Sequence, residues 1–210
     1  AVKGGIRVME LAMTRENFWK YIAEAHKKEK DNNGIMNYLV EKLSNGSYEE
    51  IFSFGIIVDE IMLESYNQRL WCASYLLNGD TREESFDFFR LWLISQGEKI
   101  YNDVMKNPDN LIKYVEEPDE DFIADLYENE DFFFVAVDAF GIKNDMGIFE
   151  ELFEIYLGEF DSYKEKLHYN DEDYPKLKLT WCEKVPKSMK KICPKLFERF
   201  YIGEDEYTRN

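Results

Sequence analysis

The stretch FDFFRLWLISQG, residues 86–97, is almost wholly apolar but carries an arginine, Arg90, at its centre. On a helical wheel at about 100° per residue, Arg90 falls on the apolar face between Phe86 and Leu93. A helix that is apolar nearly all round is usually buried. The charged guanidinium then needs a carboxylate or carbonyl partner, and Asp87, three residues earlier, can supply one. We therefore predict that Arg90 and Asp87 form a structural ion pair that locks helices together, the alternative being an anion clamp at a pocket.

The sequence on both sides of this stretch also has helical periodicity. Thr14 is placed to cap an amphipathic helix, Ser47 begins a long core helix, and Gly79 ends another. Thr81 is predicted to cap the helix that contains Arg90. No segment shows the sustained alternation of apolar and polar residues that is typical of strands. The predicted fold class is therefore all-α, a single-domain multi-helix bundle.

The second half of the chain is predicted to be less regular. Helices are expected near residues 121–128 and 131–140, and a clean amphipathic pattern follows from residue 148. From about residue 162 the pattern weakens and three of the five prolines occur, so we expect irregular structure with a short final helix near residues 194–200. The predicted division is an N-terminal extension at 1–13, a helical domain at 14–160, and an irregular, basic C-terminal segment at 161–210 packed on the helical domain.

Composition limits the cellular setting. The chain has 210 residues, 45% of them hydrophobic, but no apolar run approaches the roughly 20 residues of a membrane-spanning helix. The first residues are not expected to be a signal peptide, because Glu10 interrupts their short apolar stretch. The three cysteines, Cys72, Cys182 and Cys193, form no CxxC pair. A bridge between Cys182 and Cys193 is conceivable, but reduced thiols in a cytoplasmic protein are the preferred interpretation.

Charge is the clearest functional indication in the sequence. The net charge of −17 argues against binding to nucleic acid or an anionic membrane. Residues 176–195 hold seven lysines and one acid, so the rest of the chain is still more acidic. An acidic surface of this kind suits a basic protein partner, although it also serves simply to keep a protein soluble. The predicted partner-binding residues, here called the acidic face, are Glu116, Glu117, Asp119, Glu120, Asp121, Glu128, Glu130 and Asp131.

Three segments carry a resemblance to a known family: NFWKYIAEAH at 17–26, LWCASYLLNG at 70–79 and FDFFRLWLISQGEKIYNDVMKNPDNL at 86–111. Their aromatic and arginine positions, in this order, resemble the bacterial domain of unknown function family 4240 over roughly residues 14–140. The family usually has a Ser-Asp-Asp-Gly-like turn where this chain has GDTREES, so an acidic site on that turn is not expected here. The resemblance implies no catalytic residues. By analogy, small acidic helical bacterial proteins have interaction roles, including the neutralisation of toxins.

Signatures of catalysis or cofactor binding are lacking in the sequence. There is no phosphate-binding loop, dinucleotide fingerprint or nucleophile elbow. His168 lies near several acids, but the spacing matches no helical zinc motif, so neither a metal site nor a cofactor is predicted. Trp181 is either an exposed anchor or the side chain that fixes the basic segment to the fold. We expect a non-catalytic, immunity-like interaction protein, the alternative being a small-ligand binder or enzyme with a helical pocket around Arg90.

Overall fold

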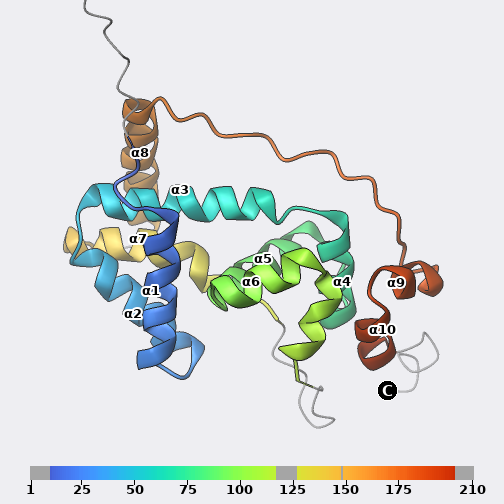
Figure 1. The fold of residues 1–210 in the computed structure, drawn as a ribbon. Coiled ribbons are helices and arrows are strands. Elements are labelled where there is room, and N and C mark those ends of the chain that lie inside the picture. The colour runs from blue at the N-terminus through green and yellow to red at the C-terminus, as the bar shows by residue number, and fades with distance from the viewer. Residues whose placement is uncertain (1–9, 117–126, 148, 202–210) are drawn as a thin grey trace, which may run out of the picture. The chain divides into compact units, whose positions relative to one another are not determined.

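A computed structural model of the chain describes residues 10–116, 127–147 and 149–201. Over these residues the fold is all-α, as predicted, and contains no strand (Figure 1). None of the described helices is both long enough and apolar enough to cross a membrane. The predicted helix near residues 121–128 falls mainly on residues outside the described ranges.

The described residues form two compact units, each with its own core. The first unit contains the residues up to Glu60 together with Asp131–Asp173, and the second contains Ile61–Glu130 together with the residues from Tyr174 onward. One division falls within helix α3, after Glu60. These divisions do not coincide with the predicted boundary at residue 160, and the predicted domain organisation stays a prediction.

The first unit is a layered group of amphipathic helices. Helix α2 packs on both α1 and α7, and α7 packs in turn on α8. Phe18, Phe54 and Phe132 bring three of the helices together, with ring centroids 4.8–6.5 Å apart. The helices of this unit are α1 (Arg15–Lys28), α2 (Asn32–Ser44), most of α3 (Tyr48–Glu64), α7 (Asp131–Lys143) and α8 (Phe149–Leu167).

The second unit is built around the sequence stretch that contains Arg90. Helix α5 packs on α4 and α6, and α4 also contacts the 3₁₀ helix η1, α9 and α10. Trp71 of α4 stacks on Phe86 of α5, with centroids 4.9 Å apart. The helices of this unit are α4 (Gln68–Asn78), α5 (Glu83–Ser95), α6 (Glu98–Lys106), η1 (Pro108–Lys113), α9 (Pro186–Ile192) and α10 (Pro194–Phe200).

Local sequence signals explain several helix ends. The Thr14 hydroxyl accepts a hydrogen bond from the Asn17 amide, which confirms the predicted cap, and Gly79 adopts the left-handed conformation that ends α4. The predicted cap at Thr81 is wrong. The cap position of α5 is Arg82, which makes no side-chain cap hydrogen bond. Asp80 accepts instead from both the amide and the guanidinium of Arg82, and this short turn orders the residues before the helix.

The C-terminal region is partly more helical than its sequence indicates. Helix α8 continues to Leu167, because Phe160, Tyr163 and Leu167 keep buried side chains at helical spacing. Residues 168–185 then contain neither helix nor strand (Figure 1). The predicted final helix is confirmed as α10, whereas α9 was not anticipated. Both helices begin at a proline, which is favourable in the first helical turn.

Trp181 fixes the basic segment to the second unit. Its side chain is buried, its ring stacks on Tyr75 at 5.7 Å, and its indole N–H donates to the carbonyl oxygen of Gln68 over 2.8 Å. Of the two roles considered for Trp181, the structure supports attachment to the fold. Asp109 makes a second attachment by accepting hydrogen bonds from the amides of Lys195 and Leu196 at the start of α10.

Candidate functional site

Four of the eight residues of the acidic face lie within the ranges that the structure describes. Glu116, Glu130 and Asp131 have exposed side chains. Glu128 is half-buried and accepts a hydrogen bond from the Ser85 hydroxyl, so part of its carboxylate is engaged within the second unit. The remaining four predicted residues, Glu117, Asp119, Glu120 and Asp121, lie outside the described residues.

The exposed members of the acidic face form no ion pair with a cation of the described residues. No ion pair joins the carboxylates of Glu116, Glu130 or Asp131 to a lysine or arginine of the described chain. Residues 116–131 also contain nine acids, Asp125 among them, and no lysine or arginine. The local excess of negative charge is therefore not neutralised by nearby residues in the sequence.

Arg90 is buried in the second unit, with only 1% of its surface exposed. Its guanidinium donates hydrogen bonds to the Asp87 carboxylate and to the carbonyl oxygen of Met62 near the end of α3. Its central carbon lies 4.8 Å from the Phe86 ring centre and 5.0 Å from that of Tyr66, distances typical of cation–π contacts. Arg90 therefore connects the end of α3 to the middle of α5.

The Asp87 end of the pair is more open than the sequence suggests. The Asp87 side chain is 43% exposed, whereas that of Arg90 is 1% exposed. Partial burial raises the pKa of Asp87 above its usual value, although Arg90 opposes that shift. Removal of Arg90 would consequently leave an unpaired carboxylate at the surface rather than one enclosed in the core.

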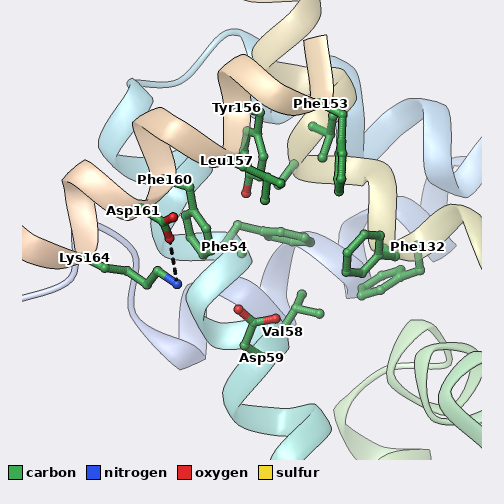
Figure 2. A pocket seen from close by; sticks show the side chains of 14 residues that line it. Phe54, Val58, Asp59, Phe132, Phe153, Tyr156, Leu157, Phe160, Asp161 and Lys164 are labelled. Atoms are coloured by element: carbon green, nitrogen blue, oxygen red, sulfur yellow. Dashed lines mark ion pairs between the residues drawn. The ribbon is translucent and has the colours of Figure 1, made fainter. Parts of the chain in front are cut away.

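A cavity of about 220 Å³ lies in the first unit, between helices α3, α7 and α8 (Figure 2). Its walls are mainly aromatic and aliphatic, with Phe54 from α3, Phe132 from α7, and Phe153 and Leu157 from α8. Figure 2 shows Asp161 and Lys164 on the side away from Phe132, and Asp59 beside Val58 on α3. The cavity is thus apolar on one side and charged on the other.

At the polar end of the cavity, negatively charged side chains outnumber positively charged ones. The Lys164 ammonium donates to two carboxylates, those of Asp161 at 3.2 Å and Asp171 at 2.9 Å. Asp59 also lines the cavity, but no hydrogen bond or ion pair joins its carboxylate to another described residue. Asp59 is an exposed residue, yet the protein around its carboxylate displaces enough water to raise its pKa to about 6. Lys164 partly offsets this shift, and Asp171 and Glu60 add to it.

Tyr156 contributes the other polar group of the cavity. The residue is 5% exposed, and its hydroxyl has no hydrogen-bond partner among the described residues. Figure 2 shows the ring extending from α8 with its hydroxyl directed toward α3. Burial, followed by the negative charge of Asp59, raises the pKa of Tyr156, so the hydroxyl is a neutral hydrogen-bonding group at physiological pH.

The sequence analysis did not identify this cavity. Its walls come from segments about 80 and 100 residues apart in the chain, near residues 54–59, 132–137 and 153–164. The one local signal is the FGIIVDE run of α3, in which Gly55 and Asp59 fall on the same helix face within an apolar sequence. Arg90, which was considered as a pocket residue, belongs to the other unit and does not line this cavity.

No group of three or more His, Cys, Asp and Glu side chains is arranged to hold a metal ion in the part of the chain that the structure describes. His168 is exposed and adopts a positive φ of 54° just after α8. The described residues thus include the exposed carboxylates of the acidic face and the cavity between α3, α7 and α8; a second, more open pocket of the first unit lies between α2 and α7 and is lined by Asp131 and Asp138.

Comparison with known proteins identifies a family but no activity. A family model described as a protein of unknown function (DUF4240) matches residues 13–141, more than half of the chain. No curated protein and no solved structure is significantly similar to the chain. The match contains α3, the Arg90 helix α5 and most of α7, while α8 lies beyond it. The chain belongs to the DUF4240 family of proteins of unknown function.

Proposed function

We propose that the chain is an acidic interaction protein that binds a basic protein partner through the acidic face. The observation that carries this proposal is the set of exposed carboxylates, Glu116, Glu130 and Asp131, that have no cation partner among the described residues. Carboxylates that stay hydrated and unpaired cost little to keep on a surface and can be neutralised by a partner's lysines and arginines.

The overall charge distribution supports the same proposal. The net charge is −17 even though residues 176–195 contribute seven lysines, so the field outside that segment is strongly negative. Such a field accelerates the approach of a basic protein and slows that of other acidic proteins and nucleic acids. We further propose that the protein acts in the cytoplasm and that its partner is a toxin that it neutralises, as an immunity protein does.

The alternative function, a small-ligand site or active site around Arg90, has less support. The guanidinium already has a carboxylate, a carbonyl and two aromatic faces as neighbours. These contacts favour a structural role that holds α3 and α5 together. The Arg90 Nε has no hydrogen-bond partner among the described residues, but it is fully buried, so an anion could reach it only if the surrounding side chains moved.

A pull-down of the tagged protein from its native host, at low and at moderate salt, tests the proposed function. The expected result is one stoichiometric basic partner, identified by mass spectrometry, that is retained at low salt and reduced at moderate salt. A variant with Glu116, Glu117, Glu120 and Glu130 changed to glutamine should lose most of that partner. The matched control changes four exposed glutamates of α8 to glutamine: Glu151, Glu154, Glu159 and Glu165.

Both variants change the net charge by the same amount, so the comparison separates a defined binding face from general acidity. Retention of the partner by the acidic-face variant, or equal loss in both variants, would contradict the proposal. Recovery of only acidic partners would contradict it as well.

A further inference from the structure

We propose that the cavity between α3, α7 and α8 binds a small molecule with an apolar body and a protonated amine. The amine pairs with the Asp59 carboxylate and donates a hydrogen bond to the Tyr156 hydroxyl, while the apolar body lies among the phenylalanine rings. This inference is independent of the proposed function, because no residue of the acidic face lines the cavity.

The shape and lining of the cavity set the size of the ligand. Apolar cavities of about 150 Å³ take up benzene, so the roughly 220 Å³ available here accommodates one aromatic ring with a short chain. Phe54, Phe132 and Phe153 surround the apolar part, and Phe133 at its rim is 45% exposed. Aromatic walls of this kind favour an aromatic or branched aliphatic group.

The charges at the polar end determine the sign of the ligand. Lys164 already forms ion pairs with two carboxylates, those of Asp161 and Asp171. Asp59 remains without a hydrogen-bond or ion-pair partner among the described residues, and Glu60 lies close enough to raise its pKa. An anionic ligand would meet this excess of carboxylates, whereas a neutral one would leave Asp59 unpaired. A cation satisfies Asp59 and brings the local charge closer to zero.

Tyr156 places a second polar group in the cavity. Its side chain is 5% exposed, lines the cavity, and makes no hydrogen bond to another described residue. The phenolic oxygen can accept a hydrogen bond from a ligand. An ammonium group that pairs with Asp59 can therefore also donate to the Tyr156 oxygen.

Amine binding should depend on pH, because it is linked to the ionisation of Asp59. Burial raises the pKa of Asp59 to about 6, with Lys164 lowering it and Asp171 and Glu60 raising it; Asp161 faces the same end of the cavity and is paired with Lys164. A bound cation favours the ionised form of Asp59. Amine binding should therefore strengthen as the pH rises through about 6 and should release a proton below that value.

Calorimetric titration of the full chain with 2-phenylethylamine, and with 2-phenylethanol as the neutral compound of similar size, tests the proposal. The amine should bind the wild-type protein at least roughly tenfold more tightly than the alcohol at pH 7.5, and this preference should shrink at pH 5. In the Asp59→Asn variant the preference for the amine should disappear. The Glu159→Gln variant removes one negative charge from α8 outside the cavity and should keep the preference.

A thermal melt of each variant establishes that it is folded before titration. Equal affinity for amine and alcohol in the wild-type protein would overturn the proposal. So would the absence of amine binding at millimolar concentration, or an equal loss of preference in the Glu159→Gln control.

Discussion

Arg90 illustrates how a charged residue can belong to a helical core. Its stem is buried, its charge is matched by Asp87, and it also bonds the Met62 carbonyl. The partner carboxylate remains 43% exposed, so an exposed-pair value of about 0–1 kcal/mol applies to the ion pair itself. The larger part of the stabilisation should come from the packing of the Arg90 side chain and its bond to the carbonyl.

The first prediction separates those contributions. Arg90→Ala should lower the free energy of unfolding by about 3 kcal/mol, because it opens a cavity in the core and removes the charged donor to the Met62 carbonyl, which keeps only the Ser65 hydroxyl as a side-chain donor among the described residues. Asp87→Asn should cost less than about 1 kcal/mol, because its carboxylate is partly solvated. Urea unfolding followed by circular dichroism measures both values. Equal costs for the two substitutions would show that the ion pair, and not the buried stem, provides the stability.

A second residue-scale prediction concerns Asp59 and pH. Its pKa is raised to about 6, so between about pH 4 and pH 6 the folded protein retains a proton that the unfolded chain releases. The contribution of Asp59 to stability therefore decreases as the pH rises through this range. Asp59→Asn should be nearly neutral at pH 4 and should stabilise the unliganded protein at pH 7.5. The gain should be roughly 1 kcal/mol, a value reduced for the solvent contact that Asp59 keeps.

Urea unfolding of the wild type and of Asp59→Asn at the two pH values checks this sign. A variant that is less stable than the wild type at pH 7.5 would contradict the account of Asp59. A carboxylate that lines a cavity and destabilises the unliganded protein fits a ligand-binding role, because binding sites often reduce stability in favour of function.

The cysteines allow a third prediction. Cys72 and Cys193 are buried, and Cys182 is exposed. A hydrogen bond with Cys193, together with burial, raises the pKa of Cys72 and keeps its thiol protonated. A thiol reagent should therefore modify one cysteine quickly in the folded protein and three after denaturation. Cys182→Ser should abolish the fast phase, and a fast phase of two or more thiols would contradict the described packing.

At the scale of elements, the contact between α3 and α8 depends on Gly55. A Cβ atom built on Gly55 would lie 2.7 Å from the Tyr156 hydroxyl and 3.2 Å from the Phe160 ring. Both neighbours are buried, so neither can move aside without disturbing the core. Glycine at this position therefore permits the close approach of the two helices beside the cavity.

The fourth prediction compares Gly55 with Gly158 of α8, where a Cβ would meet nothing within 4 Å. Gly55→Ala should destabilise the protein by about 1–2 kcal/mol, because the steric cost exceeds the gain in helix propensity. Gly158→Ala should stabilise it by up to about 1 kcal/mol, because only the propensity changes. Thermal unfolding measured by circular dichroism checks both signs, and a stabilising Gly55→Ala would contradict the described packing of α3 and α8.

The helices could largely be predicted from the sequence because their signals are local. Thr14 and Gly79 mark ends that depend on neighbouring residues alone, and the structure confirms them. Thr81 failed as a cap because Asp80 and Arg82 form a competing turn. The cavity could not be predicted, since its polar end depends on the tertiary approach of Asp59 to Lys164 from a helix about 100 residues away.

At the scale of the whole molecule, the uneven charge distribution is the feature on which the proposed function rests. Nine acids and no base occur between residues 116 and 131, and the chain as a whole carries −17. Composition alone gives the acidic character, and the basic partner inferred from it stays a prediction. The identity of the partner depends on the arrangement of charges on a second protein, which this sequence does not encode.

The rate at which the isolated partner associates with the chain, measured by stopped-flow as a function of salt, tests the central claim most directly. If the acidic face attracts a basic protein, the association rate should fall roughly tenfold or more between about 50 and 300 mM salt. The glutamine variant at Glu116, Glu117, Glu120 and Glu130 should associate more slowly at low salt and show a shallower salt dependence. An association rate that does not change with salt, or that is unaffected by these substitutions, would contradict the account.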